Sequence, residues 1–282
     1  MLSDLPALLP ALLGAGVLAG LLAGLLGIGG GLIIVPVLFE VFLLQGVPKA
    51  SAMLLATGTS LAVIVPTAMS SSLSHWRRGN VDGAILFRWF PAMLAAVVFG
   101  AWLAPSLPAE PLIGLFAVFA LSLGFLKLSG GDGAGDGKLG VEGPDEENIP
   151  MLPAAYLQLG IAAAIGFVCV LLGVGAGTLG VAVMTLFHVP MHRAVGTAAV
   201  LGLVIAAPGV LVALCHVVPA GAPVYSIGHV SVPGFLSIAP LAILMAPLGV
   251  RIGAALSARR LQQLFAGFLL AVGLRMLSRL FL

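Results

Sequence analysis

Long apolar segments constrain the fold of this chain more than any other feature of its sequence. A helix needs about 20 apolar residues to cross the roughly 30 Å hydrocarbon core of a bilayer. Eight runs reach or approach this length: Leu5–Leu26, Ala52–Leu73, Ile85–Ala104, Leu112–Leu126, Leu152–Leu172, Thr197–His216, Val230–Val250 and Leu261–Leu282. They do not alternate apolar and polar residues, as the strands of a transmembrane barrel would. Only 8% of the 282 residues are charged, against about 25% in soluble domains. The sequence therefore predicts an all-α integral membrane protein.

A polar segment divides the chain nearly in half. Residues 129–148 read SGGDGAGDGKLGVEGPDEEN and hold six of the ten acidic residues. A stretch so rich in glycine and charge cannot build a packed core. We therefore predict a flexible cytoplasmic linker over residues 129–150, between a first membrane repeat of residues 1–128 and a second of residues 151–282.

The two halves resemble each other in sequence. LLGIGGGLIIV and ATGTS in the first half recur as LLGVGAGTLGV and AVGTA in the second. A third stretch, Gly79–Gly124, aligns without gaps with Gly228–Gly273 at a constant offset of 149 residues. Internal similarity of this kind indicates a duplicated unit. We predict about five hydrophobic segments in each unit.

The distribution of Lys and Arg bears on how the halves are inserted, because cytoplasmic loops carry an excess of these residues. If the two segments around each glycine cluster make an even number of crossings, the halves are inverted, and nine of the twelve basic residues lie on or near the cytoplasmic side. A single crossing makes the halves parallel, and the division becomes seven against five. The larger asymmetry favours inverted repeats, with Lys49, Arg275 and Arg279 left outside.

The glycine clusters are the first candidates for a functional site. Glycine costs about 1 kcal/mol relative to alanine in a helix interior, and a free peptide group in lipid costs more, so such a break should line a protein-enclosed or watery cavity. A helix that restarts there would point free N–H groups and a positive dipole end at an anion. Broken helices at matching positions of inverted repeats are typical of secondary transporters. Close helix packing by small residues is the alternative. The backbone expected to contact a solute belongs to Gly29, Gly30, Gly31, Gly175, Ala176 and Gly177.

Hydroxyl groups beside these glycines form a second set of candidates. They could donate hydrogen bonds to an oxyanion without the desolvation cost of a full charge. The alternative is structural, because a buried Ser or Thr commonly bonds to its own helix backbone. The candidate residues are Thr57, Thr59, Ser60, Thr178 and Thr197.

Five charged or titratable residues are candidates for coupling or for a vestibule. Glu40 lies near the end of its segment, where it could carry a coupling proton or face the headgroups. His75, Arg77 and Arg78 follow a long apolar run, and Arg193 precedes another. These four residues are interpreted either as cytoplasmic anchors or as a vestibule that attracts anions.

Other classes of function find little support. A membrane enzyme would need a set such as HExxH or a serine with a histidine partner, and we identify none. Cys169 and Cys215 lie inside apolar runs and are interpreted as core residues. A net charge of +2 without a basic tract does not indicate nucleic acid. We therefore predict a protein that is not an enzyme and has no cofactor or metal.

The motifs resemble those of the sulfite exporter TauE/SafE family of bacterial membrane permeases. The resemblance rests on LLGIGGGLIIVPVL from Leu25, on ATGTSLAVIVPTAMSSSLSHWRRGNVD from Ala56 to Asp82, and on LLGVGAGTLGV with VPMHRAVGTA in the second half. It implies a multi-pass permease of the plasma membrane that exports a small sulfur-containing anion, such as sulfite, thiosulfate or an organosulfonate, by alternating access. A permease or channel for another small anion is the alternative.

The expected partners are a small anionic substrate and the lipid bilayer, with a homodimer left open. The two halves are not equivalent at every candidate position. Ala176 stands opposite Gly30, and Ala198 stands opposite Ser60. The second half is therefore expected to contact the solute differently from the first.

Overall fold

The computed structural model describes residues 5–26, 30–128, 154–255 and 258–281. These residues form α-helices, one short 3-10 helix and a two-stranded antiparallel hairpin. The elements in chain order are α1 (Leu5–Leu26), α2 (Gly31–Leu44), α3 (Lys49–Arg77), α4 (Gly83–Leu103), η1 (Ala104–Ser106), α5 (Ala109–Leu128), α6 (Ala155–Leu172), α7 (Leu179–Leu186), α8 (Met191–Cys215), β1 (Ser226–Ile227), β2 (Val230–Ser231), α9 (Val232–Ala255) and α10 (Ala258–Phe281). The predicted linker over residues 129–150 lies outside the described residues.

The helices confirm the prediction of an all-α membrane protein. Among the described residues, five helical segments are long and apolar enough to cross a bilayer: Lys49–Arg77, Gly83–Ser106, Ala109–Leu126, Ala155–Leu172 and Met191–Cys215. Shorter apolar stretches occur in α1, α2 and α9. The boundaries of the two membrane repeats stay a prediction.

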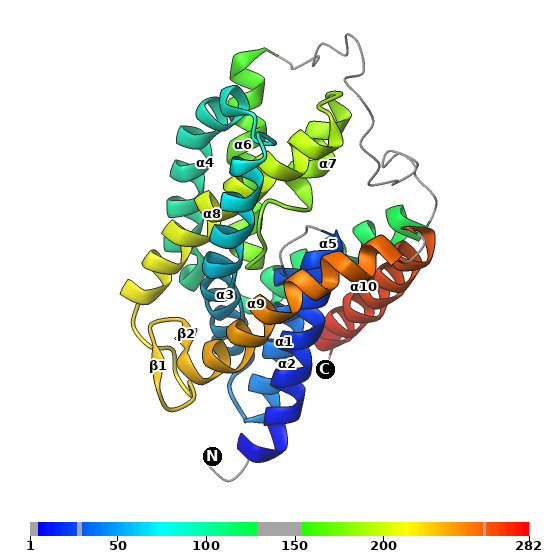
Figure 1. Ribbon diagram of the computed structural model, residues 1–282. Helices are drawn as coiled ribbons and strands as arrows, with labels where there is room; N and C mark the ends of the chain where they lie inside the picture. The colour runs from blue at the N-terminus through cyan, green and yellow to red at the C-terminus, as the bar shows by residue number, and fades with distance from the viewer. Residues whose placement is uncertain (1–4, 27–29, 129–153, 256–257, 282) are drawn as a thin grey trace.

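Helices that are equivalent by sequence occupy equivalent places in the fold. The alignment of the halves pairs α1 to α5 with α6 to α10 in order. In space, α1 packs against α9, and the equivalent pair α6 and α4 also packs together. Two further large contacts join α3 to its equivalent α8 and α5 to its equivalent α10 (Figure 1). Each half therefore contributes helices to the packing of the other.

The contact between α5 and α10 is made by equivalent residues of the two helices. A Cβ at Gly124 on α5 would lie 3.0 Å from Leu270 Cγ, and a Cβ at Gly273 on α10 would lie 2.7 Å from Leu121 Cγ. Gly124 and Gly273 are equivalent at the offset of 149, and so are Leu121 and Leu270. Glycine lets these helices approach closely, as small residues do in membrane bundles. The contact is therefore nearly two-fold symmetric.

The equivalent helices α3 and α8 run in opposite directions (Figure 1). Near the middle of α3, Leu61 faces Gly209 of α8, and Ile64, further along α3, approaches Gly175 beside the earlier residue Gly202. Two helices that are related by a two-fold axis are antiparallel only if that axis is perpendicular to them. This is the internal geometry that inverted repeats require, while the insertion of the halves in a bilayer stays a prediction.

Two apolar clusters hold the helices together. One is centred on α2, α5 and α10 and includes the fully buried Phe39 and Phe116. The other lies among α4, α6 and α8 and includes Trp89 and Met93, which are also fully buried. Residues of α3 belong to both clusters. Helix α3 therefore packs in both clusters, and it also contacts the glycine breaks.

Candidate functional site

The first glycine break leads directly into α2. Gly30 is the N-cap residue, and its carbonyl O accepts hydrogen bonds from two amides in the first turn of α2, both at 3.0 Å. Gly31 is buried, and a Cβ there would lie 2.7 Å from the carbonyl O of Gly173. The first break therefore packs against the second with no space for a side chain between them. Gly29 lies outside the described residues.

The second break begins with a left-handed glycine. Gly173 follows α6 with φ = +67°, a conformation that glycine adopts without strain. Its amide donates to Val170 O at 3.2 Å, and the amide of Val174 donates to Cys169 O at 2.9 Å. This pair of hydrogen bonds is the Schellman motif that ends many helices. The chain is then non-helical until α7 starts at Leu179.

The second break is packed tightly at Gly173, where a Cβ would lie 2.7 Å from Thr57 Cα, but less tightly further along. A Cβ at Gly175 would lie 3.7 Å from Ile64 Cγ2 and 3.9 Å from Gly202 Cα, which are ordinary contact distances. A Cβ at Gly180 would lie 3.5 Å from Ala176 Cβ. Gly175 therefore has space for a side chain, whereas Gly31 in the first break already touches a backbone carbonyl.

Thr178 carries an unpaired hydroxyl in this region. Its side chain is only 7% exposed, and its Oγ1 has no hydrogen-bond partner within the described structure. Thr178 is the N-cap residue of α7, but its side chain does not cap the helix. A buried polar group without a partner costs about 1–3 kcal/mol, so this hydroxyl is a candidate ligand-binding group. The amide of Gly180, in the first turn of α7, already donates to Ala176 O at 2.7 Å.

The hydroxyls of Thr59 and Thr197 join the two halves. Thr59 on α3 accepts a 2.9 Å hydrogen bond at Oγ1 from the amide of Ser231. Thr197, at the equivalent position on α8, accepts one at 2.9 Å from the amide of Asp82. Both threonines are fully buried, and Asp82 and Ser231 are themselves equivalent at the offset of 149. The same hydrogen bond is therefore made twice, once in each direction between the halves.

Asp82 and Ser231 also cap the helices that follow them. Asp82 Oδ1 accepts hydrogen bonds from the amides of Ala84 and Ile85 at 3.0 Å, and Ser231 Oγ accepts one from the amide of Gly234 at 3.3 Å. Such N-caps satisfy the free amides at a helix start. Each residue therefore fixes the start of α4 or α9 with its side chain and holds the other half with its backbone.

Glycines next to the two threonines permit this close approach. A Cβ at Gly58 would collide with the carbonyl O of His229, and a Cβ at Gly196 would collide with the carbonyl O of Asn80. His229 and Asn80 are again equivalent at the offset of 149. We call the paired Thr59–Ser231 and Thr197–Asp82 contacts, with these glycines, the interlock. Thr59 and Thr197 therefore have structural partners, and their contact with a solute stays a prediction.

The hydroxyls of Thr57 and Ser60 have different partners. Thr57 Oγ1 donates to carbonyls of its own helix at 3.0 Å, which is the usual arrangement for a buried threonine. Ser60 Oγ donates to the carbonyl O of Gly173 at 2.7 Å. Ser60 therefore ties α3 to the second break. Ala198, its equivalent on α8, has no hydroxyl with which to make the same bond.

Glu40 is paired with two arginines of α10. Arg275 Nε lies 3.0 Å from Glu40 Oε1, and Arg279 Nη2 lies 2.6 Å from Glu40 Oε2. Lys49 Nζ donates to the carbonyl O of Arg279 at 3.0 Å. Two of the three basic residues that the orientation analysis placed outside therefore bind the Glu40 carboxylate, and the third, Lys49, binds the backbone of Arg279. This cluster fastens α2 to α10, and a coupling role for Glu40 stays a prediction.

The predicted vestibule residues lie at the surface. His75, at the end of α3, is half-buried, whereas Arg77, Arg78 and Arg193 are exposed. Within the described part of the chain, no ion pair includes any of these three arginines. Both interpretations of these residues, as an anchor and as a vestibule, remain predictions.

Sequence reasoning missed the two capping residues of the interlock. A signal for them was present, because Asp82 and Ser231 are N-cap residue types that immediately precede the fourth long segment of each half. Their constant offset also marked them as a pair. Nothing local in the sequence, however, indicated that their amides would reach Thr197 and Thr59.

Comparison with known proteins assigns this architecture to a family. The model of the family described as sulfite exporter TauE/SafE matches residues 12–276, a range that includes both glycine breaks and the interlock. The chain belongs to the TauE/SafE family. The chain is thus a multi-pass membrane permease and not an enzyme.

Two relatives agree with this assignment. A probable membrane transporter protein of Haemophilus influenzae is 29% identical over 255 residues, which cover 89% of this chain and 90% of the relative. A probable membrane transporter protein of Methanocaldococcus jannaschii is 26% identical over 261 residues, which cover 89% of this chain and 88% of the relative. The chain has no significant match among solved structures.

Proposed function

We propose that this TauE/SafE permease exports a small sulfur-containing anion, such as sulfite, thiosulfate or an organosulfonate, across the plasma membrane. The family description supports the substrate class. The relatives are described only as probable membrane transporters, so they support transport without naming a solute. A permease or channel for another small anion is the second candidate.

The observation that carries the anion preference is the unpaired hydroxyl of Thr178 at the start of α7. Sulfite and sulfonates present several oxygen acceptors, and the unpaired Thr178 hydroxyl is a donor that matches them. Hydrogen bonds to a charged ligand contribute about 1.5–3 kcal/mol each. A few such donors hold an anion strongly enough to select it and weakly enough to release it on the other side.

The asymmetry between the two breaks supports a site in the second half. Gly31 is pressed against the backbone of Gly173, whereas the small residues around Ala176 meet at ordinary contact distances. A modest separation of α7 from α8 would open space beside Thr178 without disturbing the interlock. Alternating access in proteins built from two repeats commonly moves one group of helices against another in this way.

Transport by reconstituted protein tests the proposal. Proteoliposomes loaded with sulfite, thiosulfate, sulfoacetate, phosphate or a neutral sugar are compared for release of each solute. We expect release of at least one sulfur-containing anion and no release of the sugar. Equal release of the sugar would contradict the anion preference, and release of phosphate alone would favour the second candidate.

The site itself is tested by the variant Thr178→Val, which keeps the shape of the side chain and deletes the hydroxyl. Its affinity for the transported anion should fall roughly ten-fold to a hundred-fold, as expected for one lost hydrogen bond to a charged ligand. Thr185→Val is the matched control, because Thr185 lies on the same helix and its hydroxyl donates to Val181 O of that helix at 2.9 Å. Equal affinity in both variants and the parent would place the solute elsewhere.

A further inference from the structure

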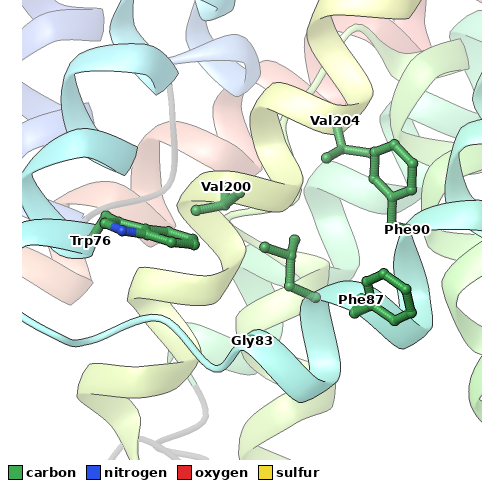
Figure 2. Close-up of a pocket in the computed structure, with 7 residues that line it drawn as sticks. Trp76, Gly83, Phe87, Phe90, Val200 and Val204 are labelled. Atoms are coloured by element: carbon green, nitrogen blue, oxygen red, sulfur yellow. The ribbon is translucent and has the colours of Figure 1, made fainter.

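A groove at the surface has a purely apolar lining. It lies between the end of α3, the start of α4 and the first half of α8 (Figure 2). Its cavity volume is about 370 Å³. Its lining includes Trp76, Gly83, Phe87, Phe90, Val200 and Val204. Phe87 is 85% exposed, so the groove opens to the outside of the molecule. In a membrane protein, an apolar surface of this kind faces the acyl chains of lipids.

One end of the groove is basic. Trp76 is followed by the exposed Arg77 and Arg78. The hydrogen bond from the amide of Asp82 to Thr197 holds the start of α8 beside the start of α4. Arg193, one turn before Thr197 and exposed, therefore lies toward the same end. The other end, at Phe90 and Val204, is apolar.

This polarity matches an amphipathic ligand with a negative head and a hydrocarbon tail. Trp beside Arg is typical of the interface between hydrocarbon and headgroups, which places the basic end at headgroup depth. Near a membrane surface each Arg contributes about 1 kcal/mol of attraction to anionic lipids. We propose that the groove binds one acyl chain of an anionic phospholipid whose phosphate-bearing headgroup contacts Arg77 and Arg78.

The headgroup part is tested by lipid binding to the purified protein in detergent, measured by native mass spectrometry. The probes are phosphatidylglycerol and phosphatidylcholine with identical acyl chains. The parent should bind phosphatidylglycerol more tightly, and the double variant Arg77→Gln, Arg78→Gln should lose about five-fold in affinity for each arginine. Arg88→Gln is the control, because Arg88 on α4 contacts Gln158 of α6 and does not line the groove. Equal binding of the two lipids by the parent would overturn the proposal.

The groove part is tested by filling it. A Cβ at Gly83 would have no atom within 4 Å, so Gly83→Leu narrows the groove without a clash in the folded protein. Gly160→Leu on α6 is the control, since its Cβ would also have no neighbour within 4 Å. Gly83→Leu should weaken phosphatidylglycerol binding, whereas Gly160→Leu should not, and both should keep the unfolding midpoint of the parent.

Two outcomes would overturn this part of the proposal. In the first, Gly83→Leu binds phosphatidylglycerol as tightly as the parent, and the acyl chain lies elsewhere. In the second, Gly83→Leu changes the oligomeric state measured by light scattering and leaves lipid binding unchanged, and the groove is then an interface between protein chains.

Discussion

The hydroxyl of Thr59 has two competing uses in this permease. The sequence predicts that it donates a hydrogen bond to an anion, and in the structure its oxygen accepts a hydrogen bond from the amide of Ser231. The second use is structural and occurs again at Thr197. Deleting the hydroxyl would therefore leave a buried amide without an acceptor, whatever the solute does.

Thr59→Val is predicted to lower the free energy of unfolding by about 1–3 kcal/mol, the cost of an unsatisfied buried amide. Thr67→Val on the same helix is the control, because the Thr67 hydroxyl donates to Val63 O within α3. The measurement is unfolding in detergent micelles, with solute affinity recorded for each variant. A ten-fold loss of affinity with unchanged stability would show instead that Thr59 contacts the solute.

The hairpin of β1 and β2 is the element that carries Ser231 to α3. Ser226 pairs with Ser231, and the turn residue His229 donates its amide to Ala213 O at 3.0 Å. The ring of His229 stacks on His216 at a centroid distance of 4.9 Å. Burial, with a smaller contribution from the charge of His216, lowers the pKa of His229 to about 4. The folded hairpin therefore favours a neutral His229.

This environment predicts a loss of stability in acid. The pKa of His229 is lower in the folded state than the ordinary value of 6.5, so the unfolded chain binds more protons between these values. The contribution of His229 to stability is complete above pH 6.5 and is lost as the pH falls toward 4. Unfolding midpoints at pH 7.5 and pH 5 measure the effect.

His229→Asn places in the hairpin the residue type of its equivalent, Asn80, and should reduce the pH dependence of the unfolding midpoint. His192→Asn, at an exposed position of α8, serves as the control. If the parent and His229→Asn lose the same stability in acid, another group is responsible.

At the scale of the whole molecule, the two halves are held by repeated contacts of equivalent parts. The interlock and the contact between α5 and α10 each occur in both directions. The turn after α3 and the hairpin lie at opposite ends of the bundle (Figure 1). If the bundle spans the bilayer along α3, these two segments face opposite sides.

We predict that the Arg77–Arg78 turn and the start of α10 at Arg259 and Arg260 face the cytoplasm and that residues 219–225 face outward. Cysteine labelling in intact cells measures this in a background with Cys215→Ser, because Cys215 is exposed and Cys169 is buried. Ala220→Cys should react with an impermeant reagent, and Arg78→Cys should not. Labelling of Arg78→Cys from outside would contradict the predicted orientation.

The sequence alone was sufficient for the class of fold and for the equivalence of the halves. Apolar segment length is a local property, and a bilayer restricts such segments to helices because their amides must be paired internally. The shared glycines likewise identified both breaks without any coordinates, and the offset of 149 paired the later segments of the halves. These conclusions depend on residues close together in the chain.

Tertiary structure decided what the candidate polar groups contact. Thr59 and Ser231 are 172 residues apart, and Glu40 and Arg275 are 235 apart, so no local pattern predicts these pairs. The fold also made the two breaks unequal, since Gly31 is packed against Gly173 while Thr178 keeps an unpaired hydroxyl. A short-range pattern determines which segments are helices and where they break. Packing between distant segments determines which hydroxyls are paired and leaves that of Thr178 without a partner.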